Sequence, residues 1–124
     1  MKIRNGEIQM GDDGIVYGSI NVPGTVHSLA DAVEITQAVE GIVGDKPAPF
    51  LIDVRHLVFI DSQAIAHFIS PAHARFIKAH ALIVDDAASR IMSRFFTEIY
   101  KPPFPIKIFT NQSQAQDWLR GFLN

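Results

Sequence analysis

The pattern of the first twenty residues predicts two short strands joined by a turn. Residues 3–10 and 14–20 have the character of strands, and the sequence GDDG between them supplies turn residues. We therefore expect a β-hairpin at the start of the chain. The next segment, NVPGTVH, has the composition of a loop.

A helical period follows and continues up to Gly44. Ser28 stands at an N-cap position, and Asp31 is the acid that a capping box places three residues later. The segment DKPAP then ends the helix. The positions that repeat at helical spacing are Leu29, Ala32, Val33, Thr36, Val39 and Val43.

The middle of the chain combines a short strand with an interrupted helix. Residues 50–54 form an apolar strand, and residues 58–60 continue it or extend its end. A helical pattern begins after Asp61 and is interrupted at Pro71. Because Ser70 and Pro71 fit an N-cap followed by the first helical position, we expect two short helices or a kink.

The last third of the chain contains two further strand–helix pairs. Residues 81–84 lack alternation, as expected for a strand buried on both faces. Asp85 or Asp86 then caps a helix, which the segment KPPFP ends, and residues 106–109 form the last strand. The final helix is indicated by Asn111, Gln114, Ala115, Trp118, Leu119 and Phe122.

The predicted order is β-β-α-β-α-β-α-β-α, so strands and helices alternate after the hairpin. Such alternation predicts an α/β fold with a mixed, mostly parallel sheet covered by helices. The N-terminal β-hairpin adds an antiparallel strand near the start. With 124 residues the chain has the size of one compact domain, which we expect to span residues 1–124.

Composition narrows the class of protein. Hydrophobic residues make up 48% of the chain and charged residues 19%, the balance of an ordinary soluble globular protein. The net charge of −2 argues against a nucleic-acid binder, and the absence of cysteine removes thiol nucleophiles and cysteine-ligated metals. No apolar segment approaches the roughly 20 residues that span a bilayer, and no signal peptide is visible. We therefore expect a cytoplasmic protein with no membrane partner.

Three features together resemble the STAS domain, the fold of sulfate transporters and anti-sigma factor antagonists. They are the hairpin followed by alternation, the stretch FLIDVRHLVFIDSQAIAHFI, and the terminal strand and helix PIKIFTNQSQAQDWL. The resemblance covers most of the chain. Its C-terminal half is more similar to an uncharacterised bacterial branch of STAS-like proteins than to the sporulation antagonists.

The resemblance also identifies a departure from the antagonist pattern. In the antagonists this helix opens Asp-Ser-Ser-Gly or Asp-Ser-Thr-Gly, and the second hydroxyl is phosphorylated by the anti-sigma kinase. Here Asp61 and Ser62 match, but Gln63 stands at the phosphoacceptor position and Ala64 at the glycine. Partner switching by phosphorylation is therefore not expected.

Two interpretations of this helix start remain open. Asp61 and Ser62 both have the side-chain oxygen of a helix cap, which needs no partner. Alternatively, Asp61, Ser62 and Gln63 form a contact site for a protein partner at the helix tip. A capping Ser62 would turn its oxygen toward the backbone and away from a kinase.

The histidines do not have the spacing of a metal site. No two of them lie three or four residues apart, as a helical metal pair requires. His73 and His80 are two helical turns apart, so they could share a helix face. We expect scattered histidines, on the surface or half-buried, and no metal or other cofactor. The five are His27, His56, His67, His73 and His80.

Two further surfaces are expected near the predicted helix that ends at Ile99. Ser89 and Arg90 follow a buried strand closely, where an open parallel sheet can bind an anion. Adjacent phenylalanines on this helix point about 100° apart, so both cannot easily face the sheet. We therefore expect a homodimer, with an apolar patch formed by Phe96, Ile99, Tyr100 and Phe104.

The sequence favours a non-catalytic regulatory or protein-interaction module with an unknown protein partner. The alternative is a domain that binds a small ligand, either an apolar molecule or a nucleotide, between sheet and helices. No paired acid and base, metal set or activated nucleophile supports an enzyme, so no catalytic residue is expected.

Overall fold

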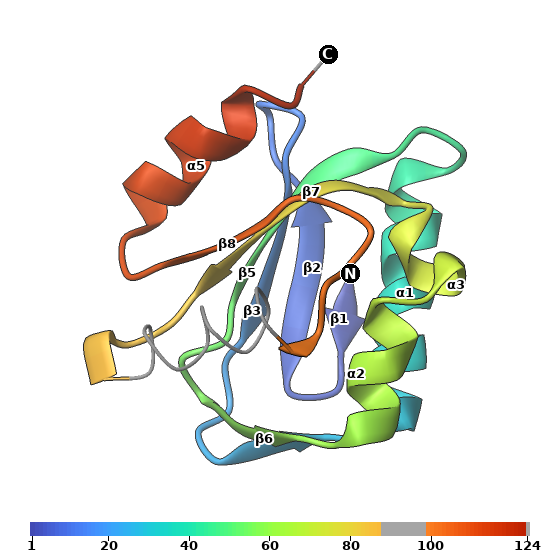
Figure 1. Cartoon of the computed structure of the whole chain (residues 1–124), viewed down its shortest axis with the longest axis vertical. Helices are drawn as coiled ribbons and strands as arrows, with labels where there is room; N and C mark the ends of the chain where they lie inside the picture. Colours follow the sequence, from blue (N-terminus) through green and yellow to red (C-terminus); the bar gives the residue numbers. More distant parts are fainter. Residues whose placement is uncertain (88–98, 124) are drawn as a thin grey trace.

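The computed structural model describes residues 1–87 and 99–123. Its main sheet has six strands in the order β1-β2-β3-β5-β7-β8 (Figure 1). From β3 onward the neighbouring strands are parallel, as the alternation of strands and helices predicted. The strands are β1 (Lys2–Ile3), β2 (Gly6–Met10), β3 (Val16–Ile20), β5 (Ala48–Asp53), β7 (Ile77–Ile83) and β8 (Ile106–Phe109).

The N-terminal hairpin is confirmed, but the first predicted strand is two strands. β2 and β3 pair antiparallel on either side of a turn that contains Gly14 at φ 86°. Before β2 the chain turns at Asn5, which has φ 66°, so β1 folds back antiparallel on β2. Asparagine tolerates this left-handed conformation better than most residues. The short edge strand β1 is the consequence.

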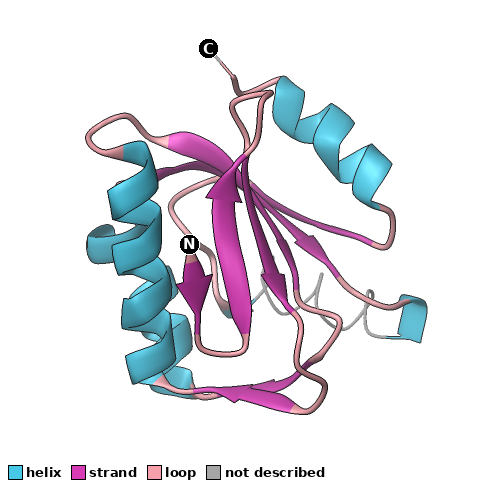
Figure 2. Ribbon diagram, turned by 180° about the vertical axis from the view of Figure 1, so that it is seen from behind, coloured by secondary structure: helices cyan, strands magenta, loops and turns pink. Residues whose placement is uncertain are grey.

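Helices cover both faces of the sheet (Figure 2). On one face lie α1 (Leu29–Val43), α2 (Ser62–Phe68) and α3 (Pro71–Ala74), and on the other lies α5 (Gln112–Arg120). The break at Pro71 thus gives two short helices, one of the two outcomes expected. The helix predicted after Asp85 or Asp86 lies mostly outside the described residues.

The two faces of the sheet carry separate apolar cores. Phe50 packs in the core beneath α1 and α2, and the next residue of β5, Leu51, packs in the core beneath α5. This follows from the pleat of a strand, which sends successive side chains to opposite faces. β7 begins at Ile77 rather than Ala81, because Ile77 and Ala79 also contribute to the two cores.

A small second sheet was not predicted. β4 (Thr25–His27) and β6 (Leu57–Ile60) pair in parallel, apart from the main sheet (Figure 1). The prediction of a loop for the whole of NVPGTVH was therefore wrong, and residues 58–60 do not extend β5. A three-residue strand is too short to show a period, and its partner lies about thirty residues away in the chain. We call this pair the β4–β6 ribbon.

A bidentate ion pair fixes the start of α1. Arg4 Nε lies 2.6 Å from Asp31 Oδ1, and Arg4 Nη2 lies 2.7 Å from Asp31 Oδ2. The backbone N–H of Ser28 also donates to Asp31 at 2.9 Å, as the predicted capping box requires. These hydrogen bonds hold the pKa of the buried Asp31 carboxyl well below its usual range, and the hydrogen bonds from Arg4 have the largest effect. Because Arg4 also donates to the Val26 carbonyl, it joins α1 to the ribbon.

Candidate functional site

The start of α2 lies directly beside the β4–β6 ribbon. The backbone N–H of Asp61 donates to the His27 carbonyl of β4 at 3.1 Å. The Asp61 carboxylate then accepts from the backbone N–H of Ala64 at 2.8 Å, which makes Asp61 the N-cap of α2. Ser62 and Gln63 follow as the first two helical residues, and both are exposed.

This geometry corrects the interpretation of Ser62 as a cap. Ser62 is already helical and exposed, and no hydrogen bond of its hydroxyl to the described chain is observed. The Ser62 hydroxyl is therefore not turned into the backbone, and the expectation that capping would hide it from a kinase is wrong. Gln63 lies at the position where the antagonist pattern has its phosphoacceptor, so the departure from that pattern is on the exposed helix tip.

Replacing Asp61 by alanine is expected to lower the free energy of unfolding by about 0.5–2 kcal/mol, the usual effect of losing an N-cap. Urea unfolding measures this difference. Ser62→Ala is the matched control, since an exposed side chain without a structural contact changes stability by less than about 0.5 kcal/mol. Equal midpoints for wild type and Asp61→Ala would show that this cap does not stabilise the domain.

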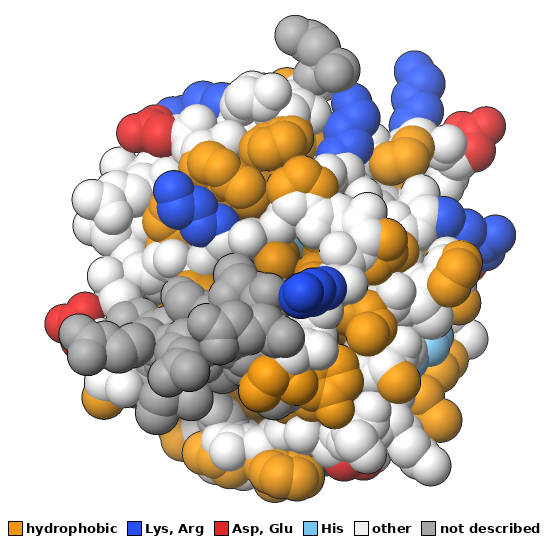
Figure 3. Space-filling model, viewed as in Figure 1, with side chains coloured by type: hydrophobic (Ala, Val, Ile, Leu, Met, Phe, Trp, Pro, Cys, Tyr) orange, Lys and Arg blue, Asp and Glu red, His pale blue; other side chains and the backbone are white. Residues whose placement is uncertain are grey.

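The ribbon carries an apolar outer surface next to this tip. Val58 is 67% exposed, Phe59 is 59% exposed and Val26 is 48% exposed. Val26 and Phe59 are register partners, so their side chains lie side by side on the outer face. Figure 3 shows apolar side chains at the lower edge of the molecule, where Figure 1 places β6. We call Val26, Val58 and Phe59 the ribbon surface.

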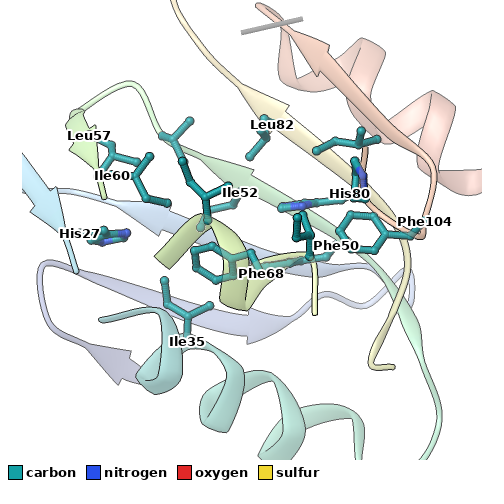
Figure 4. A pocket seen from close by; sticks show the side chains of 15 residues that line it. His27, Ile35, Phe50, Ile52, Leu57, Ile60, Phe68, His80, Leu82 and Phe104 are labelled. Carbon is teal, nitrogen blue, oxygen red and sulfur yellow. The ribbon is translucent and has the colours of Figure 1, made fainter. Parts of the chain in front are cut away.

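Behind the ribbon, a cavity lies between the sheet and α2 (Figure 4). Its volume is about 80 Å³. Its described lining comes from β4, α1, β5, β6, α2 and β7, from Val54 and Ile69 just after β5 and α2, and from residues 102–106. Among the described lining residues only His27 and His80 have polar side-chain atoms, and neither presents polar surface to the cavity. His80 stacks on Phe50 with ring centroids 4.9 Å apart and planes 3° from parallel. The Nε2 atoms of both histidines are buried and have no hydrogen-bond partner in the described part of the chain.

A second group of histidines packs against α1 near this cavity. The Thr36 hydroxyl lies 2.7 Å from His73 Nδ1 and 2.8 Å from His67 Nε2, and Thr36 also donates to the Ala32 carbonyl at 3.1 Å in one hydroxyl orientation. Burial lowers the pKa of His73 to about 4 and that of His80 to about 3. Burial also lowers the pKa of His27.

The expected scatter of surface and half-buried histidines is therefore wrong for part of the set. His27 is 2% exposed and His73 is completely buried. His73 lies on α3 and His80 on β7, so the two share no helix face. Sequence spacing missed this arrangement because it joins β4 and α1, early in the chain, to α2, α3 and β7, which lie about 20 or more residues later. Within residues 1–87 and 99–123, no three or more potential ligands from histidine, aspartate, glutamate and cysteine gather to hold a metal.

The predicted dimer patch is only partly described and is wrong for one residue. Phe104 is 8% exposed, because it packs in the core with its ring 6.0 Å from that of His80. Ile99 is 68% exposed and Tyr100 is half-buried. Phe96 lies outside the described residues, and so does the expected anion site, Ser89 and Arg90.

No described helix is long and apolar enough to cross a membrane.

Three solved structures share the fold over almost the whole chain. An uncharacterised protein of the DUF3478 family with a SpoIIAA-like fold, from Shewanella loihica PV-4, is 21% identical over 92% of this chain and 91% of its own, with a TM-score of 0.61. An anti-sigma factor antagonist from Mycobacterium paratuberculosis is 16% identical over 93% and 92%, with a TM-score of 0.61. The unphosphorylated anti-sigma factor antagonist SpoIIAA is 13% identical over 94% and 98%, with a TM-score of 0.58.

These likenesses confirm the predicted STAS-like fold, and at such identities they show the fold alone. No match was found among curated proteins. At the level of sequence, residues 9–123 match one family, which is described only as a domain of unknown function. Since this match takes in nearly all of the chain, the protein belongs to the DUF7793 family.

Proposed function

We propose that the protein is a non-catalytic regulatory module of STAS-like fold that binds a protein partner through the ribbon surface and the tip of α2. The observation that carries this proposal is the ribbon surface, whose three large apolar side chains are exposed beside Ser62 and Gln63. Exposed apolar groups that adjoin polar ones are typical of protein contact sites. The fold shared with two anti-sigma factor antagonists supports the same class of function.

The side chains at the tip have separate roles in this proposal. Asp61 is a structural residue, because its carboxylate already accepts the Ala64 N–H. Ser62 and Gln63 supply neutral hydrogen-bonding groups at the edge of the apolar contact. No residue is assigned a catalytic role, and the proposed module is a single domain of residues 1–124.

Truncating Phe59 is expected to weaken partner binding about tenfold or more, since a large aromatic anchor often supplies much of the binding energy. Tagged wild type and Phe59→Ser are compared by co-purification from the native cell, followed by quantitative mass spectrometry. Met10→Ser is the matched control, because Met10 is also an exposed apolar residue but lies at the end of β2 by the hairpin turn. A partner that Phe59→Ser retains as well as wild type does not use the ribbon surface.

Phosphorylation is not expected to control this contact. Gln63 cannot accept a phosphate and has no charge that would mimic one. Ser62 is exposed but stands one position before the acceptor position of the antagonist pattern. Intact-mass and peptide mass spectrometry of protein isolated from cells is expected to show no stoichiometric phosphate on Ser62. A fully occupied phosphoserine there would contradict the proposal.

The homodimer stays a prediction, and the ribbon surface offers a second place for it. Sedimentation at micromolar concentration distinguishes the cases. A dimer that Ile99→Ser dissociates uses the surface first expected, whereas one that Phe59→Ser dissociates uses the ribbon. A monomer under these conditions removes the dimer and leaves the ribbon surface free for another protein.

The cavity supports a second function, the binding of a small ligand. Enclosed apolar hollows are common settings for such sites, and at about 80 Å³ this one has room only for a very small molecule. The lining favours an apolar molecule over a nucleotide, because the described lining has no lysine or arginine to bind phosphate. This function is compatible with the first, since the ligand lies inside the ribbon and the protein partner outside it.

A further inference from the structure

We propose that a polar groove on the α5 face of the sheet binds an uncharged molecule with several hydroxyl groups, such as a sugar. The groove has a volume of about 520 Å³, within the roughly 300–1,000 Å³ of typical small-molecule sites. Its described lining shares no residue with the apolar cavity or with the ribbon surface. The groove is therefore a third site, independent of both functions proposed above.

The floor of the groove is the face of β2, β3 and β5 that points toward α5. Side chains on neighbouring strands lie about 5 Å apart, so one small molecule can contact a whole row of them. α5 packs on β5, β7 and β8 (Figure 1), and the β2 side chains on this face are exposed. The floor consists of two cross-strand rows, which are Gln9–Tyr17–Leu51 and Glu7–Ser19–Asp53.

A hydrogen-bond network fixes the end of the groove that lies beside the hairpin turn. The Tyr17 hydroxyl donates to Asp13 Oδ2 at 2.5 Å, and Gln116 Nε2 of α5 donates to the Tyr17 hydroxyl at 2.9 Å. The backbone N–H of Ile15 donates to Asp13 Oδ1 at 3.1 Å. The turn, β3 and α5 are thus connected through side chains. This wall is formed before a ligand binds, which lowers the entropic cost of binding.

The lining offers both donors and acceptors of hydrogen bonds. Its carboxylates accept only, whereas its amides and hydroxyls can donate and accept. The side chains of Gln9, Ser19 and Gln112 have no hydrogen-bond partner in the described part of the chain. A hydroxyl group donates one hydrogen bond and accepts others, so a molecule with several hydroxyls can pair with both kinds of group. It also replaces the hydrogen bonds of the water that it displaces.

The charges around the groove favour an uncharged ligand. No described lining residue is lysine, arginine or histidine, so an anion would meet carboxylates without a counter-ion. A cation would gain little, because three of the carboxylates already lie near a basic residue and act as hydrogen-bond acceptors rather than as free counter-ions. The three pairs are Asp53 with Arg55, Asp13 with Arg120, and Glu7 with its register partner Lys2.

Glucose, galactose and mannose serve as neutral probes, and the amino sugar and uronic acid of the tightest-binding one test the effect of charge. Each is titrated into the full chain labelled with ¹⁵N and followed in ¹H–¹⁵N spectra. We expect at least one neutral sugar to shift the side-chain amides of Gln9, Gln112 or Gln116 in a saturable manner and to leave the exposed Gln37 of α1 unchanged. The amino sugar should bind within about threefold of the neutral sugar. The uronic acid should bind about tenfold more weakly or not at all.

Two glutamines of α5 provide a matched pair of variants. Gln112→Leu should lower the affinity for the sugar about fivefold, the effect of losing one hydrogen bond. Gln114 is equally exposed on the same helix but does not line the groove, so Gln114→Leu should leave the affinity unchanged. Gln9→Leu tests the floor from β2 and should also lower the affinity about fivefold. All three positions are exposed, and the shifts of the wild-type amides locate the site if a variant fails to fold.

The outcomes either support the sugar site or overturn it. If none of the neutral sugars binds, or if the shifts lie away from the groove, the proposal is wrong. An amino sugar that binds about tenfold more tightly than the neutral one would show that the groove selects cations instead. Equal losses of affinity in Gln112→Leu and Gln114→Leu would remove the groove as the site. None of these results bears on the ribbon surface or on the apolar cavity, because the three sites share no described residue.

Discussion

Acidification from pH 7 to pH 4 is expected to unfold the domain through three histidines whose Nε2 atoms are buried, His27, His73 and His80. His73 is completely buried, and burial lowers its pKa to about 4, while burial lowers the pKa of His80 to about 3. The pKa of His27 is lowered as well. In the unfolded chain all three take up a proton near their ordinary pKa of 6.5. Their neutral forms therefore stabilise the fold above pH 6.5.

The direction follows from proton uptake by the two states. Below pH 6.5 the unfolded state binds more protons than the folded state, so stability falls as pH falls. Each histidine contributes up to about 1.4 kcal/mol per pH unit until its folded pKa is reached. Three histidines together approach about 4 kcal/mol per pH unit, a large share of the roughly 5–15 kcal/mol that stabilises a typical domain. Asp31, whose pKa is depressed, adds to this loss only near and below pH 4.

The charged groups around His27, His73 and His80 do not cancel the loss of stability at low pH. His73 is affected by His67, which is also cationic when protonated, and His80 is affected by His73. Asp31 and Glu34 favour protonation of His27, but burial outweighs them and Arg4 opposes them. Most of the loss is therefore assigned to His73 and His80.

Urea unfolding at pH 7.5, 6 and 5 measures the loss, and the pH dependence is the critical readout. His73→Leu should lower stability at pH 7.5, because the hydrogen bond to Thr36 is lost, and should also reduce the slope of stability against pH. His56→Leu, at an exposed position, should leave the slope unchanged. A midpoint that is constant between pH 7.5 and pH 5 would show that the buried rings are protonated in the folded state.

Local patterns were sufficient to predict most of the fold. The hairpin was predicted from the turn residues GDDG, and α1 was predicted from its helical period and the Ser28–Asp31 capping box. The break between α2 and α3 was predicted from Pro71. Each of these signals lies within a few neighbouring residues. The parallel sheet follows from the order of these elements. The turn at Asn5 and the three-residue strand β4 were missed, because a single left-handed residue or a very short strand gives no period.

The candidate site was less predictable because non-local packing builds it. Asp61 and Ser62 are both chemically suited to cap α2, and only the backbone geometry shows that Asp61 does so. Phe104 follows two prolines and was expected on the surface. In the structure its ring instead packs near the ring of His80, which lies on β7. The two imidazoles of the cavity come from β4 and β7, and no motif joins them in the sequence.

The β4–β6 ribbon joins the two proposed functions. Register partners Val26 and Phe59 are exposed on its outer face, while the next pair, His27 and Ile60, lines the cavity on its inner face. Along β4 the side chains alternate between these two surfaces, whereas in β6 a register shift beside Val26 leaves both Val58 and Phe59 exposed and both Leu57 and Ile60 in the cavity lining. A ligand in the cavity would touch the ribbon from the side opposite the proposed protein partner.

Replacing Phe50 by alanine is expected to destabilise the domain by about 3–5 kcal/mol, the usual range for a large aromatic residue in a core. Phe50 is 1% exposed and belongs to the core beneath α1 and α2. Its ring also stacks on His80, so the substitution removes that contact and opens the cavity toward β5. The expected volume gain should allow benzene to bind, although the cavity of the wild type is smaller than benzene requires.

Leu51→Ala is the matched control, because Leu51 is the next residue of β5 and is equally buried but faces α5. Its loss should also cost about 2–5 kcal/mol, yet it leaves the cavity lining intact and should not admit benzene. Urea unfolding gives the two stabilities, and benzene titration monitored by ¹H–¹⁵N spectra gives the binding. Phe50→Leu replaces the alanine variant if the latter does not fold at 25 °C. Benzene binding by Leu51→Ala, or a cost below about 1 kcal/mol for Phe50→Ala, would contradict the assignment of Phe50 as the wall between core and cavity.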